Sequence, residues 1–324
     1  RDILRMVVDP IVMDGRKVTA SGRIGIVASV DTKTESGETL RQAEAALRRA
    51  SAKAPRSYVV HDRKHDALER ARESLDFDLS QALGRQQLHL AYQPIVELAS
   101  GSIIGAEALM RWRHPVRGEL QPSTFVPAAE RTGTIVQLDT WALQAALREA
   151  KSWPEDTLLA VNVSAVQFRQ PDFVASVFTE LAATGFPAGR LELEVTETVL
   201  MREGRETEET LQDLIAAGVR IALDDFGTGY SALAYLARLP HHRIKLDRVF
   251  VKDLANPATA GLIEAVVAAA RDRDVMVTAE GVETTDQMEA VRRIGFTHAQ
   301  GFATGAPSCS PAMVLPGSLP QAAV

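Results

Sequence analysis

Six carboxylates and one asparagine lie within or at the ends of short apolar stretches, where an unpaired charge is costly. Carboxylates that gather in one place repel one another, so they must protonate, pair with cations or bind metal. Carboxylate and amide oxygens together form an oxygen-only ligand set, which hard cations such as Mg²⁺ or Mn²⁺ prefer. These residues are Glu107, Asn162, Glu194, Glu197, Asp224, Asp225 and Glu280.

A ligand set of this kind predicts a particular chemistry. Two metal ions roughly 3.5–4 Å apart can clamp an in-line phosphoryl displacement and acidify a bridging water. The residues therefore favour metal-assisted hydrolysis of a phosphate ester, provided that the fold brings them to one place.

The adjacent pair Asp224-Asp225 places a demand on the backbone. Neighbouring residues of a regular strand point to opposite faces, so both side chains reach one site only where the strand ends or twists. Gly227 and Gly229 follow at once and supply the conformational freedom for such a turn.

Several of these residues also have purely structural interpretations. Glu107 has the weakest one, because a lone glutamate is rare in an apolar core. Glu194 or Glu197 can be a salt-bridge partner, and an Asp-Asp pair is most often a helix cap or loop. Lys245 can be an ion-pair partner inside a barrel.

The elements that must position these residues alternate regularly from residue 88 onward. About eight strands separated by helices predict a TIM-like (β/α)8 barrel, whose catalytic residues sit at the carboxyl ends of the strands. The polar side chains would then converge on one mouth. We expect strands at 88–96, 103–112, 158–164, 191–196, 220–225, 243–247, 276–280 and 298–303, and helices at 140–151, 172–184, 207–217, 259–273 and 285–294.

The first strand of this barrel departs from the standard pattern. Only residues 97–102 separate it from the second strand, whereas a parallel crossover needs about a dozen residues. We therefore predict that the first strand runs antiparallel to the second.

Residues 1–64 predict a small α+β fragment, with strand material at 18–30, a helix at 37–52 and a short strand at 57–60. A connecting helix at 65–87 leads into the barrel at 88–313, and an irregular tail occupies 314–324. Because the sequence begins at Arg1 within what reads as a domain, we expect a fragment of a longer protein.

Composition excludes some functions. The formal net charge of the 324 residues is −6, without the basic footprint of a DNA or RNA duplex binder. The single Cys309 excludes an internal disulfide and a cysteine-based zinc site. No stretch is apolar enough to cross a bilayer. We expect no membrane contact from this fragment and a cytoplasmic location, whether alone or as the cytoplasmic part of a larger, membrane-anchored protein.

Eight motifs, in order between about residues 80 and 311, resemble the EAL family of cyclic-di-GMP phosphodiesterases, which serve bacterial second-messenger signalling. Any one of them is a weak signal, but eight in order are specific. They are 92–96 (YQPIV), 107–112 (EALMRW), 162–164 (NVS), 194–197 (EVTE), 224–231 (DDFGTGYS), 244–247 (IKLD), 279–284 (AEGVET) and 300–301 (QG).

The resemblance implies a role for each matching residue. Six of the residues above, namely Glu107, Asn162, Glu194, Asp224, Asp225 and Glu280, would bind two Mg²⁺ or Mn²⁺ ions, with Asp224 shared between them. Glu280, Lys245 and Glu107 would be catalytic. Glu197 and Glu283 would be linked to the Asp-Asp loop, which is tied to metal binding and dimer contacts. The substrate-side residues would be Gln93, Leu109, Arg111, Asp247 and Gln300.

The implied reaction is hydrolysis of cyclic di-GMP to linear pGpG, with either Glu280 or Lys245 managing the proton. Relatives dimerise, so a homodimer is expected, with residues 229–239 as a candidate region. Residues 18–26 and 43–47 resemble the carboxyl-terminal half of a GGDEF diguanylate cyclase domain. The signature hairpin is absent, so this fragment should not make cyclic di-GMP. An upstream sensor or cyclase segment is expected in the full-length protein.

Two other functions stay open. The chain can be a catalytically silent receptor that binds cyclic di-GMP, although such relatives typically lose metal ligands that this chain keeps. It can also be a partner-docking module joined to a sensor. Turnover, or tight binding without turnover, discriminates between these hypotheses.

Overall fold

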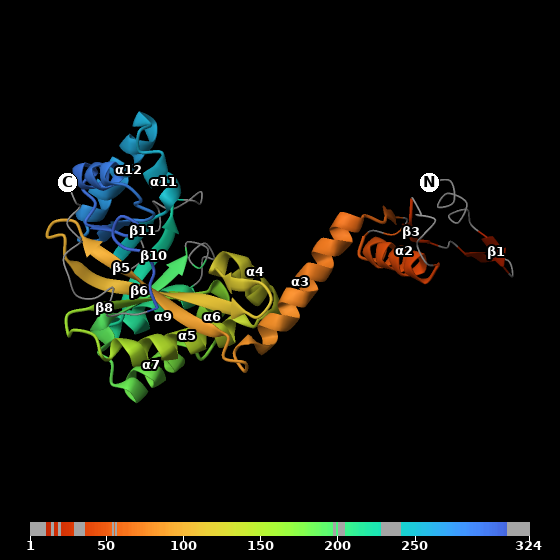
Figure 1. The fold of residues 1–324 in the computed structure, drawn as a ribbon, viewed down its shortest axis with the longest axis horizontal. Coiled ribbons are helices and arrows are strands. Elements are labelled where there is room, and N and C mark those ends of the chain that lie inside the picture. Colours follow the sequence, from red (N-terminus) through yellow and green to blue (C-terminus); the bar gives the residue numbers. More distant parts are fainter. Residues whose placement is uncertain are drawn as a thin grey trace. The chain divides into compact units, whose positions relative to one another are not determined.

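The computed structural model describes residues 11–13, 16–18, 21–28, 36–53, 55, 57–196, 199, 205–227 and 241–309. The chain divides into two compact units, Arg1–Phe77 and Asp78–Val324 (Figure 1). Within the described ranges, no helix combines the length and the hydropathy that a bilayer span needs. The predicted tail at 314–324 lies outside the described residues.

The N-terminal unit is a small α+β arrangement. Strands β1 (Ile11–Met13) and β2 (Arg16–Val18) pair antiparallel. Strand β3 (Ile24–Ile26) pairs parallel with β4 (Tyr58–Val60), and helix α2 (Ser36–Ser51) connects them. The helix and the last strand lie where the sequence predicts them. The expectation of strand along 18–30 is wrong at 21–23 and 27–28, which are not strand.

Eight strands close into a barrel in the C-terminal unit. Strand β5 pairs with β6 on one side and with β13 on the other, and this double pairing closes the sheet. Both pairings are antiparallel, whereas the other neighbours in the barrel run parallel. The predicted antiparallel first strand is thus confirmed. The strands are β5 (Leu88–Glu97), β6 (Ile103–His114), β8 (Leu158–Val163), β9 (Leu191–Thr196), β10 (Arg220–Phe226), β11 (Arg243–Leu246), β12 (Met276–Ala279) and β13 (His298–Ala299).

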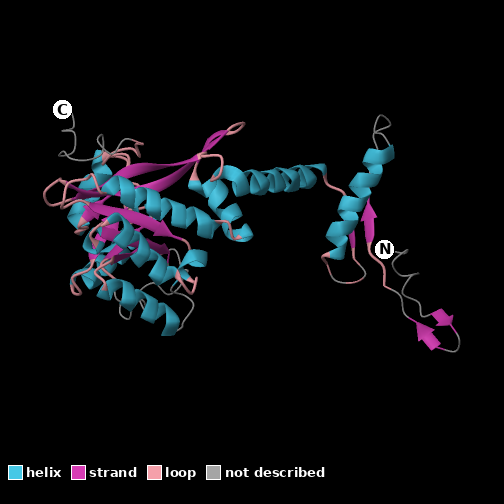
Figure 2. Cartoon of the chain, turned by 90° about the horizontal axis from the view of Figure 1, so that it is seen from below, coloured by secondary structure: helices cyan, strands magenta, loops and turns pink. Residues whose placement is uncertain are grey.

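Helices surround these strands (Figure 2). Five of them agree with the predicted segments, although α5 begins five residues earlier than expected, at Ile135. Four elements were not predicted, namely the helices α4 (Pro122–Thr132), α6 (Ala165–Phe168) and α11 (Arg248–Lys252) and the short strand β7 (Gly118–Leu120). The elements are α3 (Arg63–Ala82), which precedes the barrel, α4 (Pro122–Thr132), α5 (Ile135–Ala150), α6 (Ala165–Phe168), α7 (Phe173–Thr184), η1 (Ala188–Arg190), α9 (Arg205–Ala216), α11 (Arg248–Lys252), α12 (Pro257–Arg271) and α13 (Thr285–Ile294).

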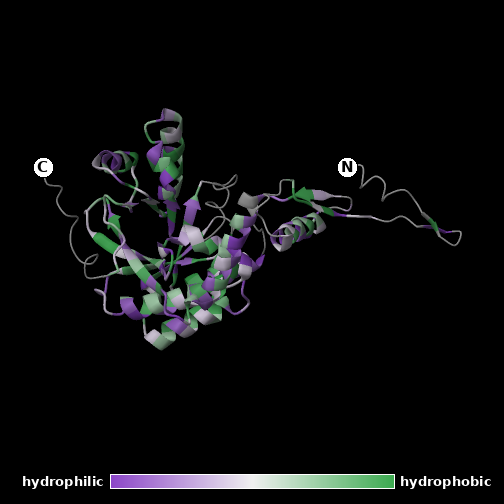
Figure 3. Cartoon of the chain, turned by 45° about the vertical axis from the view of Figure 1, so that its right-hand side comes forward, coloured by the Kyte–Doolittle hydropathy of each residue, from purple (hydrophilic) through white to green (hydrophobic). Residues whose placement is uncertain are grey.

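Alternation along the strands separates an apolar layer from a polar interior. In β9, Leu191, Leu193 and Val195 belong to the apolar core cluster. Glu192 and Glu194 alternate with them and are also buried. Because successive strand residues point to opposite faces, the two glutamates face the inside of the barrel. The helices carry both hydrophobic and hydrophilic residues, as a layer between core and solvent requires (Figure 3).

Candidate active site

A buried lysine joins four carboxylates inside the barrel. Lys245 lies on β11 with its side chain 1% exposed. Its Nζ lies 2.7 Å from Oε2 of Glu194 on β9 and 2.7 Å from Oε1 of Glu280, which follows β12. It also lies 3.3 Å from Oε2 of Glu107 on β6 and 3.3 Å from Oδ1 of Asp224 on β10. The convergence expected from the strand pattern is therefore present.

Two amides hold Glu107 in place. Asn162, on β8, donates from Nδ2 to Oε1 of Glu107 over 2.6 Å. Gln300, which follows β13, donates from Nε2 to Oε2 of Glu107 over 2.6 Å, and also to Oε1 of Gln93 over 3.2 Å. Gln93 donates in turn to the carbonyl oxygen of Gly305. Each oxygen of Glu107 thus has a donor, and its carboxylate has one orientation.

The end of β10 turns as the adjacent aspartates require. The pairing of β10 with β11 shifts register between Leu223 and Phe226, and Asp225 has a left-handed φ of 54°. Gly227 follows with a φ of 94°. As a result Asp224, Asp225 and Glu280 each offer one ligand atom, and these atoms lie within 4.8 Å of one another. The predicted turn is confirmed.

Electrostatics at this cluster follow from burial and from the lysine. Burial raises the pKa of Glu194 well above its ordinary value, and it raises the pKa of Glu280 to about 8. For Glu107, the opposing effects of Lys245, Gln300 and Asn162 outweigh burial and lower the pKa. Burial alone would lower the pKa of Lys245, but the surrounding carboxylates raise it well above its usual range. Lys245 therefore stays charged and offsets only part of the negative charge.

The donor set fits divalent cations. Oε1 of Glu194 is buried and has no hydrogen-bond partner among the residues that the structure describes. A buried carboxylate oxygen without a donor is costly, and a cation would satisfy it. The remaining ligands are carboxylate and amide oxygens, as Mg²⁺ and Mn²⁺ prefer.

A cavity of about 350 Å³ opens over the cluster. All the residues predicted on the substrate side line it. Among them, Arg111 is largely buried and donates to the carbonyl oxygen of Met110, and Asp247 caps α11 by accepting from the N–H of Val249. The lining consists of Gln93, Glu107, Leu109, Arg111, Asp224, Asp247, Arg248, Glu280, Gly281, Glu283, Gln300, Gly301, Phe302 and Pro307.

Of the two residues predicted to support the Asp-Asp loop, the structure describes only Glu283. Glu283 lines the cavity, and its Oε1 lies 3.7 Å from Nζ of Lys252. Glu197 and the candidate dimer region 229–239 lie outside the described residues.

A second buried ion pair, one that was not predicted, joins the same two strands, β9 and β11, two residues before Glu194 and Lys245. Arg243 and Glu192 are fully buried and 2.8 Å apart, and Arg243 also donates to Thr278. Strand β10 lies between β9 and β11, so this contact crosses the barrel interior. The available signal was spacing, because Arg243 precedes Lys245 by two residues and must share its face. Both basic residues are ion-pair partners within the barrel.

Several residues of the cavity wall were not predicted, namely Arg248, Gly281, Gly301, Phe302 and Pro307. All except Pro307 lie within two residues of a predicted residue. Arg248 follows Asp247, and Gly301 and Phe302 follow Gln300.

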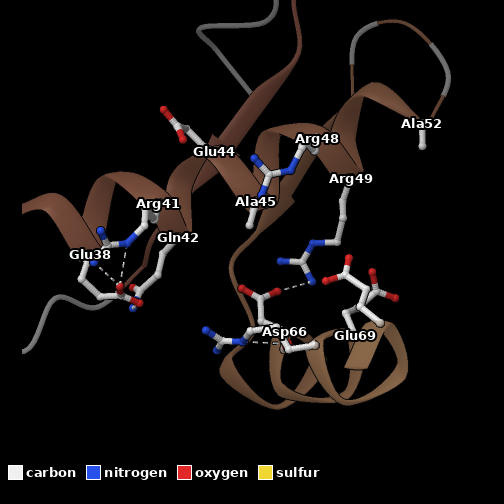
Figure 4. A pocket seen from close by; sticks show the side chains of 12 residues that line it. Glu38, Arg41, Gln42, Glu44, Ala45, Arg48, Arg49, Ala52, Asp66 and Glu69 are labelled. Carbon is white, nitrogen blue, oxygen red and sulfur yellow. Dashed lines mark hydrogen bonds and ion pairs between the residues drawn. The ribbon is translucent and has the colours of Figure 1, made fainter. Parts of the chain in front are cut away.

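A separate cavity in the N-terminal unit, of about 620 Å³, has a different character. It lies between α2 and the first part of α3 and is lined mainly by charged side chains (Figure 4). Arg41 pairs with Glu38 over 2.8 Å, and Arg49 pairs with Asp66 over 3.0 Å. The first pair is exposed, as is typical of a solvated helix face, whereas the side chains of the second are only 19% and 13% exposed.

The fold and the site together define a class of protein, a TIM-like barrel with a cluster of carboxylates at its mouth that could hold a metal ion. Residues 77–307 match the family model of the EAL domain. The chain belongs to the EAL domain family, which confirms the resemblance of its eight motifs.

Two curated proteins of Pseudomonas aeruginosa are similar to this chain. One is the bifunctional diguanylate cyclase/cyclic di-GMP phosphodiesterase MucR, 38% identical over 94% of this chain and 45% of its own length. The other is the cyclic di-GMP phosphodiesterase NbdA, 37% identical over 93% of this chain and 39% of its own length. The chain thus spans less than half the length of both relatives.

A solved structure is also similar, that of the PaMucR phosphodiesterase in complex with c-di-GMP. It superposes with a TM-score of 0.71 at 43% identity, covering 74% of this chain and 99% of that chain.

Proposed function

We propose that the barrel hydrolyses cyclic di-GMP to linear pGpG with the help of two Mg²⁺ or Mn²⁺ ions. The observation that carries this proposal is the cluster of carboxylates at one barrel mouth, where Asp224, Asp225 and Glu280 each offer an atom within 4.8 Å of the others. Support for the substrate comes from the two relatives named as cyclic di-GMP phosphodiesterases and from the solved complex.

The metal ions would be held by the carboxylates and the single amide of the cluster. Divalent ions bound there supply Lewis acidity and lower the pKa of a coordinated water. The ligands in this proposal are Glu107, Asn162, Glu194, Asp224, Asp225 and Glu280.

Other side chains of the cavity orient the substrate and handle the proton. Arg111 presents a planar guanidinium, which pairs well with phosphate oxygens. Proton transfer is assigned to Glu280 and Lys245, whose Oε1 and Nζ lie 2.7 Å apart. Glu107 is held by Asn162 and Gln300 and faces the same space. The remaining residues on the substrate side are Gln93, Leu109, Asp247 and Gln300.

The N-terminal unit is proposed to be the remnant of a cyclase-like domain. The similarity to MucR extends over 310 residues, which is more than the 77–307 segment holds, so it reaches into this unit. In the proposal the unit itself makes no cyclic di-GMP. Homodimerisation, an upstream sensor and a cytoplasmic location stay predictions.

Two substitutions test the assignment of the ligands. Asp224→Asn and Glu107→Ala each remove a carboxylate from the cluster, so we expect both to abolish hydrolysis of cyclic di-GMP, measured as pGpG release with Mn²⁺. Circular dichroism checks that each variant is folded. Turnover close to that of the unsubstituted protein, by either folded variant, would show that the cluster is not the catalytic metal site.

A further inference from the structure

Phe302 is an exposed aromatic residue at the edge of the active-site cavity. Its side chain is 67% exposed, although the burial of a phenylalanine side chain is energetically favourable. The apolar side chains of Leu109 and Pro307 line the same cavity, beside the polar cluster. One part of the cavity is therefore suited to a charged phosphate and another to a flat apolar group.

The turn that carries Phe302 is held firmly. Before it, Val282 donates to the carbonyl oxygen of Gln300, and after it Ala303 donates to the carbonyl oxygen of Val282. The buried Thr304 accepts from the N–H of Gly301 and donates to its carbonyl oxygen, both through Oγ1. These bonds fix the backbone on either side of the exposed ring.

Close packing adds to this constraint. A Cβ on Gly301 would lie 2.2 Å from the carbonyl oxygen of Val282, so the two backbones approach as only glycine permits. An aromatic ring on a rigid turn loses little conformational entropy when a ligand covers it.

The turn is also tied to the acidic cluster. Gln300, two residues before Phe302, donates to Glu107 over 2.6 Å. The position of the ring is thus set relative to the carboxylates that would hold the reacting phosphate.

We propose that Phe302 is a stacking platform for a purine base of the substrate and thereby sets the preference of this site for nucleotide diesters. This inference rests on the proposed function, because it assigns the base of the same substrate. Aromatic rings stack on nucleobases through their π faces, and this geometry needs one exposed face at a fixed place. The phosphate would lie at the cluster and Arg111, and the base would cover the ring.

Steady-state kinetics with cyclic di-GMP and Mn²⁺ test the proposal with three variants. Phe302→Ala removes the ring, and we expect KM to rise about tenfold or more with kcat changed by less than about threefold. Phe302→Tyr keeps the ring and should keep KM close to its original value. Val116→Ala is the matched control, since Val116 is 87% exposed and lies outside the lining of the cavity.

Base stacking also has a spectroscopic signature. A cyclic dinucleotide with 2-aminopurine in place of one guanine, bound in the presence of Ca²⁺, should lose fluorescence with the unsubstituted protein and with Phe302→Tyr. Phe302→Ala should not quench it, even at saturating protein.

The outcomes separate this inference from the function on which it rests. Unchanged KM and unchanged quenching in Phe302→Ala, with normal turnover by the unsubstituted protein, would overturn the stacking role alone. Absence of both binding and turnover in the unsubstituted protein would overturn the proposed function and the stacking role together.

Discussion

Lys245 is fully surrounded by acidic side chains, and its charge is needed in the metal-free protein. Four carboxylates lie within 3.3 Å of its Nζ. Removing one partner of a buried ion pair leaves an uncompensated charge, which typically costs about 3–5 kcal/mol. The lysine is thus a structural counter-ion as well as a candidate in catalysis.

Substitution of this lysine separates the two roles. In EDTA, Lys245→Met should lower the free energy of unfolding by about 3–5 kcal/mol, measured by urea denaturation. It should also abolish turnover. Affinity for Mn²⁺, measured by calorimetry, should stay the same or increase, because a positive charge leaves the neighbourhood of the cation.

A marked fall in the Mn²⁺ affinity of Lys245→Met would contradict this prediction. It would show that Lys245 is needed to hold the metal ligands in position. Arg148→Met is a suitable control, because Arg148 lies on the surface helix α5, away from the cluster. It should change neither Mn²⁺ affinity nor turnover.

The end of strand β10 determines whether both aspartates reach the site. Gly227 has a φ of 94°, and a Cβ there would lie 2.8 Å from the ring of Phe250. Gly227→Ala should therefore lower the free energy of unfolding by about 1–3 kcal/mol. It should also weaken Mn²⁺ binding about tenfold or more, because Asp225 shifts with the backbone.

Gly101→Ala provides the matched control for this change. Gly101 also has a positive φ, of 72°, but nothing lies within 4 Å of a Cβ at that position. We expect a comparable loss of stability of about 1–2 kcal/mol and no effect on Mn²⁺ affinity. Equal effects of the two substitutions on Mn²⁺ affinity would refute the role of the turn.

Helix α5 carries a buried carboxylate that makes stability depend on pH. Asp139 is 6% exposed and accepts a hydrogen bond from the N–H of Ser164, next to the end of β8. Burial raises its pKa from an ordinary 3.8 to about 6. The folded protein therefore binds more protons than the unfolded chain between these values, and stability falls as pH rises through that window.

Asp139→Asn should remove this dependence, since the amide oxygen can still accept from Ser164 and carries no charge. The shift in pKa corresponds to about 3 kcal/mol. We expect the variant to gain up to about that much stability relative to the unsubstituted protein between pH 4 and pH 7, by urea denaturation. A stability difference that is constant with pH would show that Asp139 is not perturbed.

The predictability of these elements from sequence varied with their length and spacing. The antiparallel first strand followed from the short connection between β5 and β6, which has five residues, 98–102, and is too short for a parallel crossover. Helices α6 and α11 span only four and five residues, too few for a periodic pattern. Helix α4 contains Pro127, which argues against a helix by local rules. The prediction of a strand at 298–303 is wrong beyond Ala299, because residues 301–304 form a turn in which Thr304 donates to the carbonyl oxygen of Gly301.

At the candidate site, residue types were predictable but pairwise contacts were not. The charged residues at the strand ends could be singled out because charges in apolar strands need partners, whereas the choice of six ligands came from the family resemblance. The bond from Gln300 to Glu107 joins residues 193 apart in sequence and depends on the closed barrel. Similarly, Phe302 gave no signal of its own, because only the cavity shows that its exposed ring lies beside the cluster.

The division of the chain into two units predicts two responses to metal. The cluster lies wholly in the C-terminal unit, so ligand binding stabilises that unit alone. At a Mn²⁺ concentration about 100 times Kd the gain is about 2.7 kcal/mol. By scanning calorimetry the transition of the barrel should move up by about 5–10 °C, and the transition of the N-terminal unit should not move. An equal shift of both transitions would contradict a metal site confined to the barrel.

The most direct test of the account is the identity of the product. The protein, loaded with Mg²⁺ or Mn²⁺ and shown to be folded, is incubated with cyclic di-GMP, and the nucleotides are separated by chromatography and identified by mass. Linear pGpG should accumulate with either ion and form far more slowly with Ca²⁺, whose looser coordination suits the chemistry poorly. Tight binding of cyclic di-GMP without pGpG under every divalent ion would contradict the account and identify a receptor.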